Sequence, residues 1–241
     1  MNTQLLYLES LDAIECNAQI IEILTDSDKI TLILDRTVFY PQGGGQPYDT
    51  GIIENSSAKF VVTEVRFIDG IVKHIGKFEY GVFVVGDIVH CLVNQERRNL
   101  NSQLHSAGHV IDMAVAQLKL DWTPGKGFHF PEGPYVEYAG NLDGVDKEAL
   151  LKNIQDLCRQ LIKDGFETTL VFMSKSEMSK VCRYVSPFIP EGKPGRVVMY
   201  GTFGVPCGGT HVAQSSDIKD IVIRKIKIEK GAIRVSYDIA R

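Results

Sequence analysis

Two short stretches of the sequence each place two metal-binding side chains four positions apart. In "HSAGH" these are His105 and His109, which would project from the same face of a helix, one turn from each other. In "PCGGTHV" they are Cys207 and His211, separated by glycines that permit a turn. Imidazole and thiolate are both good zinc ligands, so the sequence predicts that the two pairs bind one Zn²⁺ together.

Each pair by itself also has an ordinary explanation. Two histidines four apart can fall by chance on an amphipathic helix, and a cysteine near a histidine is commoner still. However, the chain has only six histidines, and three of them belong to these pairs. Ser106 follows the first histidine, so the pattern lacks the glutamate of the HExxH metalloproteases. Catalytic zinc normally keeps one position open, which leaves both four bound ligands and one displaced ligand as alternatives.

The composition narrows the class of protein. The chain has 241 residues, 44% hydrophobic and 23% charged, enough for one large domain or two modest ones. Five cysteines at irregular spacing do not form a disulfide framework, which favours a reduced, cytoplasmic setting. The sequence predicts neither a membrane span nor a secretory signal. A net charge of −4 argues against general coating of nucleic acid but permits a local basic face.

Residues 1–92 are predicted to form a β domain. Short runs rich in Val, Ile and Phe are broken there by Gly, Asp and Asn. These runs are "KITLILDRTVFY", "KFVVTEVRFI", "IVKHIGKF" and "VFVVGDIVHCLV". Several short strands at this spacing are typical of a small barrel or sandwich, and we expect no helix before Asn94.

Residues 93–241 are predicted to form an α+β domain, which begins with a helix. Apolar positions recur at helical spacing from Glu96 to Leu118, and Pro124 and Gly125 are expected to close this segment. The stretch "GFHFPEGPYVEY" then predicts a hairpin, because Pro and Gly lie between aromatic and β-branched residues.

Two further helices carry recognisable capping residues. Asp146 is the expected N-cap of a helix that ends at Gly165. Ser174, with Glu177 three residues later, predicts a capping box at the start of a short helix. The expected strands are "FETTLVFM", "GRVVMYG", "DIVIRKIKIEKG" and "AIRVSYDI".

The two pairs, in this order and about a hundred residues apart, resemble the signature of the editing domain that alanyl-tRNA synthetases share with the free-standing AlaX proteins. Residues 34–51, "LDRTVFYPQGGGQPYDTG", resemble the glycine-rich motif of the synthetase and of the longer AlaX proteins. Together with "PGKGFHFPEGPYVEY", the likeness covers nearly the whole chain. The resemblance implies an α+β protein with a β-barrel-like N-terminal domain. An α/β zinc-containing editing domain of the threonyl- and alanyl-tRNA synthetase type would follow it.

For function, the resemblance implies hydrolysis of the ester in mischarged tRNA(Ala). The substrate would carry serine, and in some relatives glycine, and one Zn²⁺ per chain would be held by His105, His109, Cys207 and His211 at the catalytic site. No region is expected to bind ATP or to charge tRNA, so the chain looks like a stand-alone editing protein. Two alternatives remain open: another mischarged tRNA as substrate, or a structural-zinc RNA-binding module without catalysis.

The resemblance also points to substrate-binding residues. Thr37 matches the threonine to which recognition of the serine hydroxyl is assigned in the longer AlaX proteins, although it could be an ordinary strand residue. Gly43, Gly44, Gly45 and Gln46 form the "GGGQP" loop, which is no P-loop because no Lys-Ser/Thr follows. The loop is either a hairpin turn or backbone packed against the editing cleft, or both.

Contact with tRNA would need basic residues, and two groups are candidates. A charge run is as often a solvated face, so the sequence alone does not decide between these roles. The candidates are Lys219, Arg224, Lys225, Lys227 and Lys230 near the end of the chain, and Arg97 and Arg98 in "QERRN".

Overall fold

The computed structural model describes residues 2–26, 29–187 and 189–240. The chain divides into two compact units, one of residues 1–43 with 47–99 and one of residues 44–46 with 100–241. The domain boundary between residues 92 and 93 stays a prediction. Within the described ranges, no helix has the length and apolar character needed to cross a membrane.

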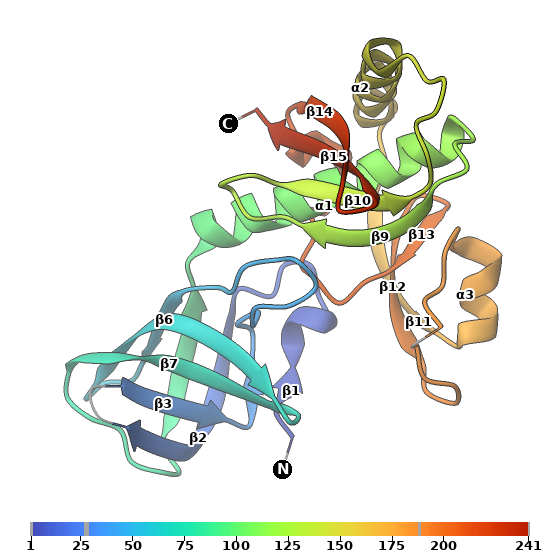
Figure 1. The fold of residues 1–241 in the computed structure, drawn as a ribbon. Coiled ribbons are helices and arrows are strands. Elements are labelled where there is room, and N and C mark those ends of the chain that lie inside the picture. The colour runs from blue at the N-terminus through green and yellow to red at the C-terminus, as the bar shows by residue number, and fades with distance from the viewer. Residues whose placement is uncertain (1, 27–28, 188, 241) are drawn as a thin grey trace. The chain divides into compact units, whose positions relative to one another are not determined.

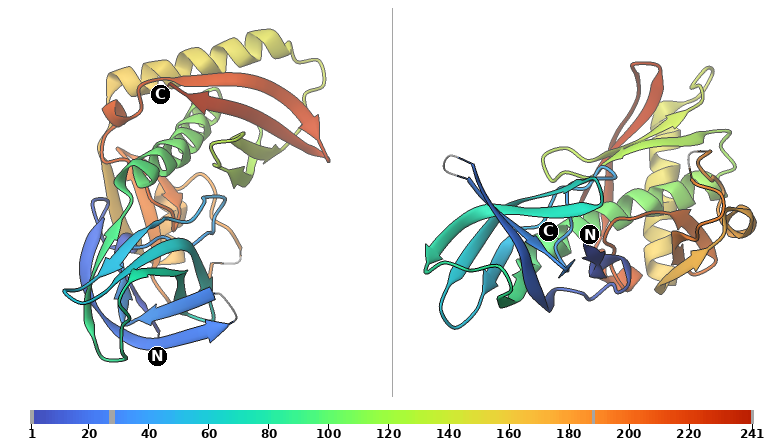
Figure 2. Two further views of the ribbon diagram at one scale, coloured as in Figure 1. Left: turned by 90° about the vertical axis from the view of Figure 1, so that its left-hand side faces the viewer. Right: turned by 90° about the horizontal axis from the view of Figure 1, so that it is seen from below.

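The first unit is a closed β-barrel with strand order β2–β3–β7–β6–β5–β8, coloured blue to blue-green in Figures 1 and 2. All neighbouring strands are antiparallel. The strands are β2 (Glu15–Asp26), β3 (Lys29–Leu34), β5 (Gly51–Glu54), β6 (Lys59–Ile68), β7 (Ile71–Tyr80) and β8 (Ile88–Val93). The barrel predicted from the N-terminal runs is therefore confirmed.

Buried and exposed side chains alternate along the barrel strands, and the buried ones fill the interior of the barrel. In β8, Val89, Cys91 and Val93 are buried while the residues between them are more exposed, because successive side chains point to opposite faces. One predicted run is divided, since "KITLILDRTVFY" forms β3 and then the short β4 (Arg36–Thr37). β4 pairs in parallel with β1 (Gln4–Leu5), which a short 3₁₀ helix follows (Leu6–Leu8).

Arg98 forms a buried ion pair with Asp49 inside the first unit. Their side chains are 3% and 0% exposed, and Arg98 Nη2 lies 2.5 Å from Asp49 Oδ2. Arg98 also donates to the carbonyl oxygens of Ala13 and Val38. A guanidinium engaged in this way offers no charge to a phosphate. The hypothesis that Arg98 contributes to an RNA-binding face is therefore wrong, and its contacts instead join three segments of the first unit.

His74 makes the first unit sensitive to acid. Its Nδ1–H donates to the Leu32 carbonyl, so the neutral ring accepts at Nε2 from the Thr37 hydroxyl. Burial lowers the pKa of His74 from 6.5 to about 4. Below about pH 6.5, His74 becomes protonated in the unfolded chain, whereas in the folded protein it stays neutral down to about pH 4. Stability therefore falls between about pH 6.5 and pH 4, by about 1.4 kcal/mol per pH unit.

We expect His74→Asn, which keeps a donor for Leu32, to reduce this pH dependence while lowering stability overall. Urea denaturation between pH 4.5 and 7.5 gives the free energy of unfolding at each pH, and hence its slope against pH. His90→Gln is the control, because His90 is partly exposed and should keep the wild-type slope. Equal slopes in His74→Asn and the wild type would contradict the assignment.

The second unit is organised around helix α1 (Gln95–Gln117), of which the residues from Leu100 onward belong to this unit. The predicted helix from Glu96 to Leu118 is confirmed to within one residue at each end. Its apolar side chains are buried because they recur on one side of the helix. Those with no exposed surface are Leu104, Ala107, Val110, Ile111, Ala114 and Val115.

Two antiparallel sheets share a hydrophobic core with α1 and α2. The four-stranded sheet has the order β14–β15–β10–β9 and the three-stranded sheet has the order β11–β12–β13. Their strands are β9 (Thr123–Phe128), β10 (Tyr135–Ala139), β11 (Thr168–Met173), β12 (Gly195–Tyr200), β13 (Phe203–Pro206), β14 (Ile221–Glu229) and β15 (Ala232–Ile239). Figure 1 shows α1, in green, beside the four-stranded sheet.

Both predicted caps are present. Asp146 accepts from the backbone N–H groups of Glu148 and Ala149 at the start of α2 (Lys147–Asp164), which Gly165 ends with φ 84°. Figure 2 shows α2, in yellow, along the red β14–β15 hairpin, where the Gln155 side chain bonds to the β14 backbone. Ser174 and Glu177 form the capping box of α3 (Lys175–Val181).

In the first unit, β2 and β5 were not among the predicted runs. In the second unit, two details differ from the sequence prediction. Pro124 and Gly125 do not close the α1 segment but lie within β9, which pairs with β10 as the predicted hairpin. β9 is an edge strand of its sheet, where a proline is tolerated because one side needs no ladder hydrogen bond. β13 was not predicted, since its four residues, "FGVP", are too short for a periodic signal.

Candidate metal centre

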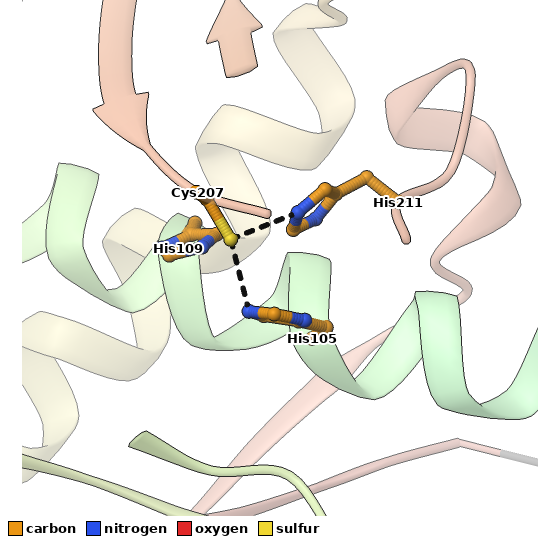
Figure 3. Close-up of side chains that lie close together, drawn as sticks. All are labelled: His105, His109, Cys207 and His211. Carbon is orange, nitrogen blue, oxygen red and sulfur yellow. Dashed lines mark hydrogen bonds between the residues drawn. The ribbon is translucent and has the colours of Figure 1, made fainter. Parts of the chain in front are cut away.

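The four predicted metal ligands meet in the second unit. One potential ligand atom from each of His105, His109, Cys207 and His211 lies within 4.8 Å of all the others. Cys207 Sγ is 3.4 Å from His105 Nε2 and 3.3 Å from His211 Nε2 (Figure 3). His105 and His211 are 2% exposed, whereas His109 and Cys207 are only partly buried.

Helix α1 and the turn after β13 position these side chains. The one-turn spacing on α1 brings the rings of His105 and His109 to 5.1 Å between centroids. Arg196 Nη1 clamps the turn by donating to the carbonyl oxygens of Cys207 and Gly209, each at 2.8 Å. The buried Arg196 thus holds both ends of the segment from Cys207 to Gly209.

The turn approaches α1 so closely that residue 209 has to be glycine. A Cβ on Gly209 would lie 2.2 Å from His105 Cε1 and 2.3 Å from His105 Nδ1. At Gly208, in contrast, a Cβ would meet no atom within 4 Å. The two adjacent glycines of "CGGTH" therefore have different roles, and only the second is required for the contact with the histidine ring.

Every imidazole of the cluster is held from behind through Nδ1. This leaves each Nε2 facing the centre, which is the usual arrangement of histidines that bind zinc. The partners are Gln46 Oε1 at 2.8 Å for His105, Asp112 Oδ2 at 3.0 Å for His109, and Tyr200 Oη at 2.8 Å for His211. Asp112 is itself fixed, because the Tyr138 hydroxyl donates to its other oxygen at 2.6 Å.

The electrostatics of the cluster favour a positive charge at its centre. Burial lowers the pKa of His109, but the Asp112 carboxylate and the adjacent Cys207 sulfur outweigh it and raise that pKa to about 10. Burial raises the pKa of Cys207, and His109 reverses this, so the Cys207 pKa is lowered overall. Burial and then the neighbouring histidines lower the pKa of His105 well below its ordinary value. The surroundings thus keep His105 neutral and the thiol readily ionised.

These residues fit a zinc ion. His109 Nε2 is buried and has no hydrogen-bond partner among the described residues, so a cation that displaces its proton would give this nitrogen a partner. One thiolate and three neutral imidazoles suit a borderline-soft ion such as Zn²⁺. The Asp112 carboxylate behind His109 is the kind of acceptor that raises the basicity of a metal-bound histidine.

Among the residues predicted to bind substrate, the structure separates two groups. Gly44, Gly45 and Gln46 belong to the second unit. Gly45 accepts from the backbone N–H of His129 at 2.8 Å, and with its φ of 78° a Cβ there would lie 2.1 Å from the Gly127 carbonyl oxygen. Gln46 is fully buried against His105. Thr37 and Gly43 belong to the first unit, and their contact with substrate stays a prediction.

His129 is a site residue that the sequence did not single out. Its buried ring stacks on His105 with 4.3 Å between centroids. Tyr237 Oη donates to the Leu104 carbonyl, so His129 Nδ1 donates to Tyr237 Oη at 2.7 Å and its Nε2 is unprotonated. Its only sequence signal is a place in "GFHF", where it alternates with two aromatic residues. Tyr200 and Gln46 act behind the ligands and carry no spacing signal of their own, whereas Asp112 follows His109 by three residues on α1.

Comparison with known proteins gives a matching family model and several similar proteins. The family model described as "tRNA synthetases class II (A)" matches residues 6–97. The alanyl-tRNA editing protein AlaX-L of Pyrococcus horikoshii is 30% identical over 233 aligned residues, covering 92% of this chain and 54% of that protein. The alanine–tRNA ligases of Methanobrevibacter smithii and Thermococcus kodakarensis are 28% identical over 98% of this chain, covering 27% and 26% of their own lengths.

The resemblance predicted from the motifs is thereby confirmed. Over nearly its whole length the chain is similar to an alanyl-tRNA editing protein and to alanine–tRNA ligases. It spans about half the length of AlaX-L and about a quarter of the two ligases.

Proposed function

We propose that this chain is a zinc-dependent aminoacyl-tRNA deacylase, which hydrolyses the ester of Ser-tRNA(Ala) and of Gly-tRNA(Ala). The observation that carries the proposal is the convergence of three imidazole Nε2 atoms and one thiol sulfur within 4.8 Å, in a chain related to an alanyl-tRNA editing protein. The relatives' names supply the class of substrate, and the site supplies the chemistry.

An aminoacyl ester is already activated, so its hydrolysis needs a positioned water and stabilisation of the developing oxyanion. A bound zinc supplies either a water of lowered pKa or an anchor for the substrate's amino group or ribose. The protein's own side chains hold the geometry fixed. Arg196 clamps the turn that carries the thiol, and Asp112 and Tyr200 orient two of the imidazoles.

Discrimination between serine and alanine requires a polar partner for one hydroxyl, and Thr37 is our candidate. Thr37 donates its hydroxyl proton to His74 and accepts from the backbone N–H of Phe39 at 3.0 Å. One lone pair remains, so Thr37 would act towards serine only as an acceptor. An alanyl ester would leave that acceptor unpaired, which is how a buried polar group discriminates.

The function is tested with a panel of mischarged tRNAs. We expect the zinc-loaded protein to hydrolyse Ser-tRNA(Ala) faster than Ala-tRNA(Ala) and faster than tRNAs mischarged with other amino acids. Removing the metal with a chelator should slow the reaction at least about a hundredfold, and added Zn²⁺ should restore it, since loss of the ion removes the chemistry it supplies. Equal rates with and without metal would remove zinc from the mechanism.

Thr37→Val tests the specificity assignment. We expect about tenfold or greater loss of Ser-tRNA(Ala) hydrolysis, because one hydrogen bond to the substrate is lost, with metal content unchanged. Thr37→Ser keeps the hydroxyl and should retain most of the rate. Wild-type hydrolysis by Thr37→Val would show that another residue recognises serine.

The same panel separates two further functions. Preference for another mischarged tRNA would keep the hydrolase and change its substrate. Zinc binding without hydrolysis of any member would indicate a structural-zinc RNA-binding module, for which the His/Cys cluster is equally suited chemically.

A further inference from the structure

Gln46 is the last residue of the "GGG-Gln" stretch, yet its side chain is 0% exposed. It lies between two segments that carry the metal ligands, α1 and the turn of "CGGTH". Its Oε1 is 2.8 Å from His105 Nδ1 and accepts from the backbone N–H of Thr210 at 3.0 Å. Its Nε2 donates to the Thr210 hydroxyl at 2.9 Å. All of these contacts lie within the second unit.

These contacts fix which way the Gln46 amide points. The Thr210 backbone N–H can only donate, so the atom that faces it must be the amide oxygen. The same oxygen faces His105 Nδ1, which must therefore carry the ring proton. The lone pair of His105 is then on Nε2, the nitrogen 3.4 Å from Cys207 Sγ.

We infer that Gln46 is a positioning residue of the metal centre, which selects the His105 tautomer and couples that ring to the turn that carries Cys207. Gln46 orients a zinc ligand and does not itself contact substrate. The inference rests on the proposed zinc site. It means that the glycine-rich loop places Gln46 where it can orient His105.

The neighbouring residues explain why glutamine suits this position. A Cβ on Gly209 would come within 3.0 Å of Gln46 Oε1, so the small turn leaves just enough room for the amide. Thr210 Oγ1 continues the network to Ser102 Oγ at 2.8 Å, which ties the amide nitrogen back to α1. The amide thus supplies the acceptor that His105 and the Thr210 backbone require, and its nitrogen adds a donor towards the Thr210 hydroxyl.

The test is zinc affinity in the full chain, measured by competition with a chromogenic chelator, with no tRNA present. Gln46→Leu removes both polar atoms, and we expect zinc affinity about 10–100-fold weaker than in the wild type. Gln46→Glu keeps the acceptor and should bind zinc at least as tightly as the wild type. Cys158→Ala removes a buried side chain of the second unit outside the cluster, so it serves as the control for lost packing and should bind zinc as tightly as the wild type.

A second readout follows the His105 ring directly. Nitrogen-15 NMR of the zinc-loaded wild type and Gln46→Glu should show a proton on Nδ1, protected from exchange, and a metal-bound Nε2. Equal affinity of Gln46→Leu and the wild type would overturn the inference. An equal loss of zinc affinity in Gln46→Leu and Gln46→Glu would also overturn it, because Gln46 would then act only by filling space.

If Gln46→Leu does not fold, Gln46→Glu decides by itself, and tenfold weaker binding there would overturn the inference. Absence of deacylation by the zinc-loaded wild type would overturn the proposed function and leave this inference standing.

Discussion

His105→Ala and Cys207→Ala each lose stoichiometric zinc and at least about a hundredfold of the deacylation rate. Changes behind a ligand typically cost 10–100-fold in metal affinity, so removal of a ligand itself costs more. His105 also supports the stack with His129, and Cys207 provides the only thiolate of the cluster. Elemental analysis after dialysis and single-turnover hydrolysis of Ser-tRNA(Ala) measure the two quantities.

A matched control separates metal binding from general damage. Cys158→Ala removes a thiol that is fully buried in the second unit but lies outside the cluster, on the core-facing side of α2. We expect it to keep its zinc and its activity, at some cost in thermal stability. Full activity of metal-free His105→Ala would rule out the proposed role of the ion.

We expect Gly209→Ala to weaken zinc binding strongly, whereas Gly208→Ala should leave it nearly unchanged. The added methyl at residue 209 would overlap the His105 ring at 2.2–2.3 Å, far inside van der Waals contact, and Arg196 holds the turn so that it cannot easily retreat. The methyl at residue 208 would point into open space. The two variants carry the same substitution at adjacent positions, so each serves as a control for the other.

Zinc content and thermal unfolding of both variants test this prediction. We expect Gly209→Ala to lose at least about tenfold in zinc affinity, as for displacement of a ligand ring or its support. Equal zinc affinity of the two variants would show that the turn and α1 approach less closely than described.

The sequence predicted much of the fold because local signals agreed with one another. Asp146 and Ser174 mark helix starts through side-chain bonds to their own first turns, and these bonds need no distant partner. The barrel strands alternate with a clear period of two. β9 was harder to locate, since Pro124 and Gly125 look like the end of a segment until the strand is known to be an edge.

The four ligands of the candidate metal centre were predictable for the same reason. Each pair is local in sequence, so spacing alone reveals it. The contacts of Gln46 and Tyr200 with these ligands could not be predicted, because both residues are distant in sequence from the parts of the fold they meet or lack a recognisable spacing. The sequence assigned Gln46 to the substrate, and its 0% exposure and its bond to His105 favour a position behind the metal centre.

The account depends on one divalent ion at the place where α1 and the turn after β13 meet. A crystal structure of the purified protein with anomalous data collected at the zinc edge tests this most directly. We predict one strong peak, about 2.0–2.1 Å from histidine Nε2 atoms and about 2.3 Å from Cys207 Sγ. Well-ordered side chains of His105, His109, Cys207 and His211 around no anomalous peak, in zinc-supplemented protein, would contradict it.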